Sequence, residues 1–154
     1  MALRFDLGPF EQLHIGKCMI KNSQVRALFV IEGEMPILRA TAYLQPGLAK
    51  GPLEKLYCCI QKMYLEHAHE ELQGTYLALA ASSVREDRAL STELGSVDQL
   101  VADRQHFKAL KALRKLIRAE AFRVDKTADE YYLARAARYS KLREDEGHQA
   151  VENK

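Results

Sequence analysis

The fold is decided over residues 28–65, where the chain passes from a β-rich part to a helical part. This stretch begins Leu28-Phe29-Val30-Ile31-Glu32-Gly33-Glu34-Met35-Pro36-Ile37-Leu38-Arg39 and ends Met63-Tyr64-Leu65. Its opening apolar run is typical of a β-strand and breaks at Gly33. Proline disfavours helix in the residue before it, so Met35-Pro36 favours an extended segment, whereas Pro52 can begin a helix. The stretch therefore predicts a boundary between strands and helices.

Residues 3–32, before this boundary, show the patterns of short strands. Apolar residues alternate with polar ones from Leu3 to Leu7, as in a strand with one buried face. A second strand is expected over 13–20 with a bend or bulge at Gly16, and a third over 25–31. We expect an antiparallel meander of three to five strands, which needs helices against one face to be stable.

Helices are predicted after the boundary. Apolar residues recur at spacings of three and four from Leu53 to Tyr64. The helical pattern continues over 66–86, with Gly74 a candidate break. Ser96 is expected to cap a short helix that runs to Val101.

The C-terminal third predicts two more helices. The helix over about 104–124 is amphipathic, and a capping box at 127–130 opens a last helix that runs to about Arg143. The apolar side of the first of these helices carries Phe107, Leu110, Leu113 and Ile117.

These elements predict an α+β fold, in which a small N-terminal antiparallel β-meander packs on a C-terminal bundle of four to five helices. We expect three parts. Residues 1–50 form a β-rich unit, residues 51–125 form a helical unit that shares its core, and residues 126–154 form a helical extension with a frayed end. The 154 residues are enough for such an arrangement.

No pattern favours an enzyme or a cofactor, since glycine-rich phosphate loops and nucleophile elbows are absent from the sequence. His67 and His69 resemble a metal pair, but residues two apart on a helix point about 200° apart, so a solvated face is expected. Cys18, Cys58 and Cys59 lack zinc spacing and are expected to be buried thiols. The absence of a signal peptide or a long apolar run predicts a cytoplasmic protein without a membrane partner.

Charge is unevenly distributed although the net charge is only +2. The sums are +2 over residues 1–50, −5 over residues 51–103 and +5 over residues 104–154. An acidic middle and a basic end suggest two surfaces with different partners.

The strongest signal of function is a basic stripe on the helix predicted from residue 104. Five cations fall within roughly an 80° sector at about 100° per residue, and Arg114 adds a sixth. No acid interrupts them, which favours an anionic partner, although a solvated or intramolecularly paired face stays open. The RNA-binding candidates are Arg104, Lys108, Lys111, Arg114, Lys115 and Arg118.

Weaker candidates lie at both ends of the chain. Cations decorate the predicted meander, and aromatic and guanidinium groups in the last helix suit stacking on unpaired bases. A core role for those tyrosines is the alternative. These weaker candidates are Lys17, Lys21, Arg26, Arg39, Tyr131, Arg135 and Arg138.

Three sequence blocks are more specific in their order and spacing than any single short motif. They are Ile31-Glu32-Gly33 with Pro36-Ile37-Leu38-Arg39, then Leu56-Tyr57…Gln61…Met63-Tyr64-Leu65, then Phe107-Lys108-Ala109-Leu110-Lys111…Arg114-Lys115-Leu116-Ile117. Together they resemble the FlbT family of flagellar biosynthesis regulators. The resemblance covers roughly residues 1–120, and residues 121–154 look like an extension. Gly51-Pro52 stands where a hydroxyl or acidic cap is expected, and Phe10-Glu11 stands where a glycine-containing turn is expected.

The resemblance implies a post-transcriptional regulator that binds the 5′ untranslated region of flagellin mRNA and alters its translation or stability. Repression is the family's best-known mode, a FlaF-type regulator is an associated partner, and no enzymatic activity is implied. A protein-binding adaptor or chaperone-like sensor for flagellin or the FlaF-type regulator, without direct RNA binding, is the alternative. A homo-oligomer is compatible with either.

Overall fold

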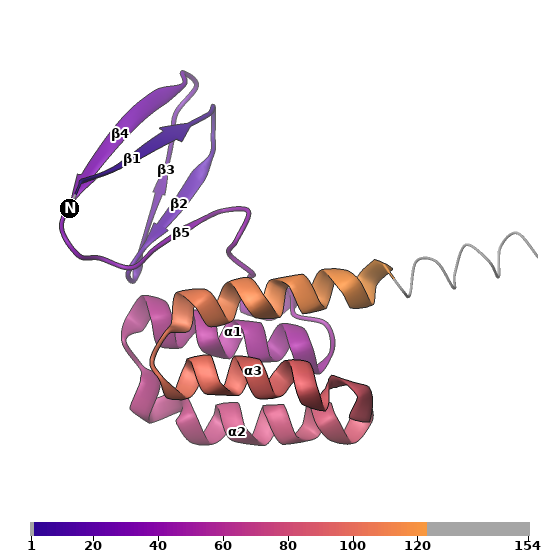
Figure 1. The fold of residues 1–154 in the computed structure, drawn as a ribbon. Coiled ribbons are helices and arrows are strands. Elements are labelled where there is room, and N and C mark those ends of the chain that lie inside the picture. Colours follow the sequence, from indigo (N-terminus) through magenta and orange to yellow (C-terminus); the bar gives the residue numbers. More distant parts are fainter. Residues whose placement is uncertain (1, 123–154) are drawn as a thin grey trace, which may run out of the picture. The chain divides into compact units, whose positions relative to one another are not determined.

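A computed structural model describes residues 2–122 of the chain, which divides into two units, residues 1–115 and residues 116–154. The first unit carries five strands followed by helices (Figure 1), so the predicted α+β class is confirmed. In the second unit the described residues, 116–122, are helical. The division expected at residues 50 and 125 stays a prediction, and the helix expected from residue 127 lies outside the described residues.

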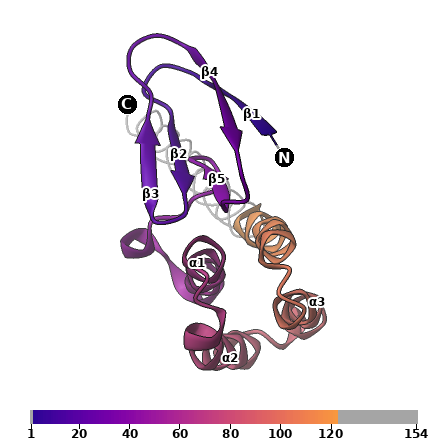
Figure 2. The same cartoon turned by 90° about the vertical axis from the view of Figure 1, so that its left-hand side faces the viewer.

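The five strands form two small antiparallel sheets (Figure 2). One sheet pairs β1 with β4, and the other has the order β3-β2-β5. Because β1 pairs with β4 rather than with β2, the connectivity is not that of a plain meander. The strands are β1 (Ala2–Leu7), β2 (Gln12–Ile15), β3 (Cys18–Lys21), β4 (Ala27–Glu32) and β5 (Ile37–Arg39).

The strand expected over 13–20 is in fact a hairpin of β2 and β3. Ile15 pairs with Cys18, which leaves Gly16 and Lys17 as a two-residue loop. Gly16 has a φ of 55°, and glycine at the first central position is what a type II′ hairpin turn requires. Gly16, which the sequence predicts to form a bend or bulge, therefore lies in the turn that reverses the chain.

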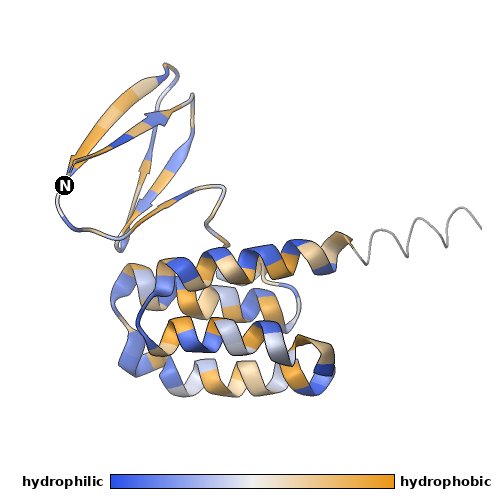
Figure 3. Ribbon diagram, viewed as in Figure 1, coloured by the Kyte–Doolittle hydropathy of each residue, from blue (hydrophilic) through white to orange (hydrophobic). Residues whose placement is uncertain are grey.

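One small core holds the strands together. Leu7, Leu13 and Ile37 are buried at its centre, and these residues come from β1, β2 and β5. Half-buried Phe29 and Ile31 of β4 pack against them. Strand β4 is hydrophobic over nearly its whole length (Figure 3), so it also carries apolar residues on its outer face.

Helix α1 (Gly51–Glu66) begins one residue before the predicted proline, and it buries the predicted stripe except for half-buried Tyr64. Lys50 makes no side-chain cap, but its backbone N–H donates to the carboxylate of Glu54. The acidic group that is expected before the helix is thus supplied by a residue of its first turn. The buried apolar residues of the predicted stripe are Leu53, Leu56, Tyr57, Ile60 and Met63.

The boundaries of the next helices differ from the expected ones. Helix α1 ends at Glu66, and the next residue, His67, has a φ of 53°. Helix α2 (His69–Glu86) then runs without a break through Gly74. The predicted break was therefore placed too late in the chain. A short 3₁₀ turn, Arg88–Leu90, leads into α3 (Ser91–Ala102), so Ser96 lies inside α3 and does not cap it.

The following helix begins at residue 106 rather than at about 104, and helical residues continue to 122. Within 106–115, Leu110 and Leu113 are buried as predicted, whereas Phe107 is exposed. Within residues 2–122, no helix combines the length and the apolar character that a membrane crossing requires.

Strands and helices of the first unit are joined by hydrogen bonds to the segment 37–44. Gln61 accepts a hydrogen bond from the N–H of Leu44 at 2.9 Å and donates one to its carbonyl at 2.8 Å. The Tyr57 hydroxyl donates to the carbonyl of Ala42 at 2.5 Å, and the N–H of Ile37 donates to the Tyr64 hydroxyl at 3.3 Å. The segment after β5 is therefore fixed to one side of α1.

Candidate nucleic-acid interface

Three lysines share the exposed side of helical residues 106–115. At about 100° per residue, Lys108, Lys111 and Lys115 lie within roughly a 60° sector, with buried Leu110 and Leu113 on another side of the helix. None of the three forms a salt bridge within the described residues. This basic face, Lys108, Lys111 and Lys115, is the part of the predicted stripe that the first unit leaves available to an anion.

An aromatic ring lies beside the basic face. The ammonium of Lys111 is 4.9 Å from the centroid of the Phe107 ring, and Phe107 is 42% exposed. Its ring also contacts Tyr64, with the two centroids 5.7 Å apart. Phe107 was expected on the apolar side of the helix, but it instead offers a stacking surface next to a cation.

Two of the predicted cations are engaged within the protein. Arg104 lies in a turn with a φ of 58°, before the helix begins, and pairs with the carboxylate of Glu70. That pairing lowers the pKa of Glu70. Arg114 donates to the carbonyl of Thr41 at 2.6 Å. Arg118 is exposed on the helical residues of the second unit.

The weaker candidates do not gather into one site. Lys17 is exposed in the loop of the β2–β3 hairpin and Lys21 is exposed at the end of β3. Arg26 pairs with Asp6 at 2.8 Å, and Arg39 lies 3.8 Å from Glu11. Tyr131, Arg135 and Arg138 lie outside the described residues.

The histidines form a different arrangement from the expected solvated face. His67 ends α1 and is exposed, but His69 opens α2 and is buried, with its Nδ1 2.8 Å from Nε2 of His106. Burial, followed by the neighbouring His69, lowers the pKa of His106. Across residues 2–122, no three His, Cys, Asp or Glu side chains are grouped to hold a metal ion.

The cysteines are only partly buried, contrary to expectation. Cys59 is buried and Cys58 is half-buried, and burial raises the pKa of both thiols. Cys18 is exposed on β3. All four residues of β3, which is an edge strand of its sheet, are exposed.

Sequence reasoning missed four residues that the fold brings to one groove: His14, Tyr43, Lys55 and Lys62. Lys55 and Lys62 are seven residues apart on α1, so helical periodicity could have placed them on one face. His14 and Tyr43 meet only through tertiary structure, and no local signal announces their contact.

Comparison with known proteins matches residues 3–124 to the family described as flagellar protein FlbT. The chain belongs to the FlbT family. It is 33% identical over 120 residues to a probable flagellum biosynthesis repressor protein FlbT of Rhodopseudomonas palustris, with 78% of this chain and 95% of that protein covered. A FlbT 1 protein of Bradyrhizobium diazoefficiens, also named a probable flagellum biosynthesis repressor, is 32% identical over 78% of this chain and 83% of its own length.

A third FlbT relative, the flagellum biosynthesis repressor protein of Caulobacter vibrioides, is 27% identical over 78% of this chain and 87% of that protein. No solved structure matches the chain. The resemblance carried by the three sequence blocks is thereby confirmed, and membership of the family supports a regulatory role in flagellum biosynthesis.

Proposed function

We propose that this FlbT-family chain is a cytoplasmic, non-enzymatic regulator of flagellum biosynthesis that binds the 5′ untranslated region of flagellin mRNA and alters its translation or stability. The names of its relatives, flagellum biosynthesis repressors, favour repression as the outcome. The observation that carries RNA binding is the basic face, whose three lysines have no salt-bridge partner within the described residues.

In this proposal the basic face holds phosphates and positions the RNA, while aromatic side chains contact unpaired bases. Lysine ammonium groups attract phosphates without reading sequence, so they supply affinity rather than specificity. Phe107, exposed beside Lys111, is placed to stack on a base that leaves the strand.

Salt dependence of leader binding tests the proposal. For single-stranded RNA, each neutralised phosphate contributes about 0.7 to the slope of log K against log salt. Replacing Lys108, Lys111 and Lys115 by Gln should therefore flatten the slope by about 2. A matched variant with Lys50, Arg85 and Arg88 replaced by Gln removes three exposed charges elsewhere and should retain the wild-type slope. Equal slopes for all three proteins would contradict a role for the basic face.

A protein-binding adaptor for flagellin or a FlaF-type regulator is the second candidate. It is favoured by the outer face of β4, where Leu28 is 65% exposed and Val30 is 56% exposed. Adaptor function requires a complex that co-purifies with this chain after nuclease treatment and that Leu28→Ser with Val30→Thr disrupts. Direct regulation requires that the purified protein alone shifts the leader RNA.

A further inference from the structure

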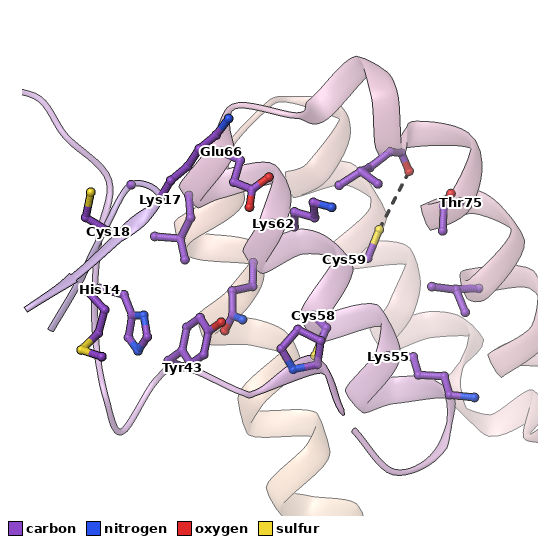
Figure 4. A pocket seen from close by; sticks show the side chains of 17 residues that line it. His14, Lys17, Cys18, Tyr43, Lys55, Cys58, Cys59, Lys62, Glu66 and Thr75 are labelled. Carbon is purple, nitrogen blue, oxygen red and sulfur yellow. Dashed lines mark hydrogen bonds between the residues drawn. The ribbon is translucent and has the colours of Figure 1, made fainter. Parts of the chain in front are cut away.

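A groove of about 580 Å³ lies in the first unit between α1, α2 and the β2–β3 hairpin (Figure 4). This volume is within the range of about 300–1,000 Å³ that is usual for ligand sites. Side chains of Leu65, Leu72 and Leu79 make part of its lining apolar. The groove is separate from the basic face, because it includes no residue after Leu79.

A stacked pair of rings lines one side of the groove. The imidazole of His14 and the phenol of Tyr43 are nearly parallel, with an interplanar angle of 10° and centroids 3.6 Å apart. Burial lowers the pKa of His14, which favours the neutral imidazole. A neutral, flat pair of rings is a surface on which a nucleobase can stack.

The pair is held in place by the segment that carries Tyr43. Carbonyl groups on either side of Tyr43 accept hydrogen bonds from Tyr57, Gln61 and Arg114, which belong to two different helices. Arg114, expected to contact RNA directly, therefore acts as a positioning residue for Tyr43. A ring fixed before binding loses little conformational freedom when a ligand arrives.

Cations surround the groove. Lys17, Lys55 and Lys62 line it from the hairpin and from α1, and all three are exposed. Glu66 is the one carboxylate in the lining, and none of the lysines forms a salt bridge within the described residues. The groove thus combines an excess of positive charge with a stacking surface and apolar walls, as single-stranded nucleic-acid sites do.

We infer that this groove binds an unpaired segment of RNA, with bases on the His14–Tyr43 pair and the apolar wall and phosphates on Lys17, Lys55 and Lys62. The inference rests on the proposed function and adds to it a second place where bases are contacted, apart from Phe107. The basic face then serves the flanking backbone.

Leader RNA and a fluorescent eight-nucleotide oligouridine, both titrated with the full-length protein, test the inference. Base stacking on an aromatic ring is worth about 1–3 kcal/mol, so Tyr43→Ala should weaken binding of both RNAs about tenfold or more. Tyr43→Phe keeps the ring and should restore binding. Lys17→Gln with Lys62→Gln should flatten the salt slope by about 1.4, whereas Lys50→Gln with Arg88→Gln should not. Thermal melting confirms that each variant folds.

The outcomes separate this inference from the function on which it rests. Leader binding by the wild type together with wild-type affinity in Tyr43→Ala and in the Lys17/Lys62 variant overturns the groove and leaves the proposed function standing. Failure of the wild type to bind leader RNA overturns the proposed function and the groove with it. Groove variants that bind RNA normally but lose co-purifying flagellin would assign the groove to a protein partner and also overturn the inference.

Discussion

Asn22 is the most heavily hydrogen-bonded side chain of the strand region. Its Nδ2 donates to the carbonyls of Leu7 at 3.0 Å, Gly8 at 2.9 Å and Val25 at 2.9 Å, and its Oδ1 accepts from the N–H of Ser23 at 2.9 Å. The residue is buried. It therefore ties the end of β1 to the turn before β4, which brings the two paired strands of one sheet into register.

Asn22→Ala should destabilise the protein by about 3 kcal/mol. Each lost hydrogen bond is worth about 1 kcal/mol, and the carbonyl of Leu7 would be left without this donor in a buried site. Urea unfolding at equilibrium measures the change. Gln24→Ala, on the exposed part of the same turn, should change stability by less than about 0.5 kcal/mol. A change in Asn22→Ala as small as in Gln24→Ala would contradict this account.

The His69–His106 contact predicts that stability depends on pH. The pKa of His106 is lowered by burial, then by His69, Arg104 and His67, whereas Glu70 opposes the shift. The unfolded chain then binds more protons than the folded protein, so the stabilisation is complete above the ordinary pKa of 6.5 and is lost as the pH falls below it.

The urea midpoint should consequently be lower at pH 5.5 than at pH 7.5. His106→Gln should reduce this difference, because the variant no longer gains a proton at that site on unfolding. A smaller difference should remain, since burial also lowers the pKa of His14. The same pH dependence in both proteins would show that the histidine contact is not the cause.

At the scale of elements, the sequence predicted what local periodicity determines. The buried stripe of α1 follows directly from a spacing of 3.6 residues. The period of two holds in β1 at half-buried Phe5 and buried Leu7, whereas Leu3 is exposed. The break between α1 and α2 could not be predicted in this way, because His67 adopts a positive φ without a glycine or proline to signal it. Arg104 likewise adopts a positive φ before the next helix, which begins at residue 106.

Pairing between distant segments could not be predicted from a local sequence pattern either. Leu3 lies opposite Ile31 in the β1–β4 sheet, and the intervening chain forms a separate hairpin. The basic face could be found from its spacing alone, whereas the groove needs the contact between β2 and the segment after β5. Sites built from one element are therefore predictable here, and sites built across elements are not.

The glycines within the helices give an element-scale prediction. Gly74 lies inside α2, and a Cβ added there would meet no atom within 4 Å. Gly74→Ala should therefore stabilise the protein by about 0.5–1 kcal/mol, because alanine favours helix and restricts the unfolded chain.

Gly16→Ala is the matched comparison and should destabilise. Gly16 has a φ of 55°, and an added Cβ would lie 2.8 Å from the terminal methyl of Met35. Thermal unfolding should show a higher Tm for the Gly74 variant and a lower Tm for the Gly16 variant. A lower Tm for Gly74→Ala together with a higher Tm for Gly16→Ala would mean that neither helix propensity nor turn geometry governs these positions.

At the scale of the first unit, one segment connects the two features that the proposed function uses. Thr41 accepts a hydrogen bond from Arg114 on the helix of the basic face, and Tyr43, two residues later, stacks on His14 in the groove. Gln61 fixes the end of this segment to α1. The groove and its connection to the basic face therefore depend on the same set of hydrogen bonds. Movement of the segment from Thr41 to Leu44 would change both together.

This arrangement predicts that RNA length selects which lysines contribute to binding. An eight-nucleotide oligouridine confined to the groove should have a slope of log K against log salt near −2, since each of three lysines contributes about 0.7. The Lys108/Lys111/Lys115→Gln variant should leave that slope unchanged. Leader RNA that engages the groove and the basic face should have a slope near −4, which the same variant should reduce to about −2. Fluorescence anisotropy over a range of salt concentrations measures both slopes. Equal sensitivity of the short and long RNAs to the basic-face substitutions would contradict two separate contact regions.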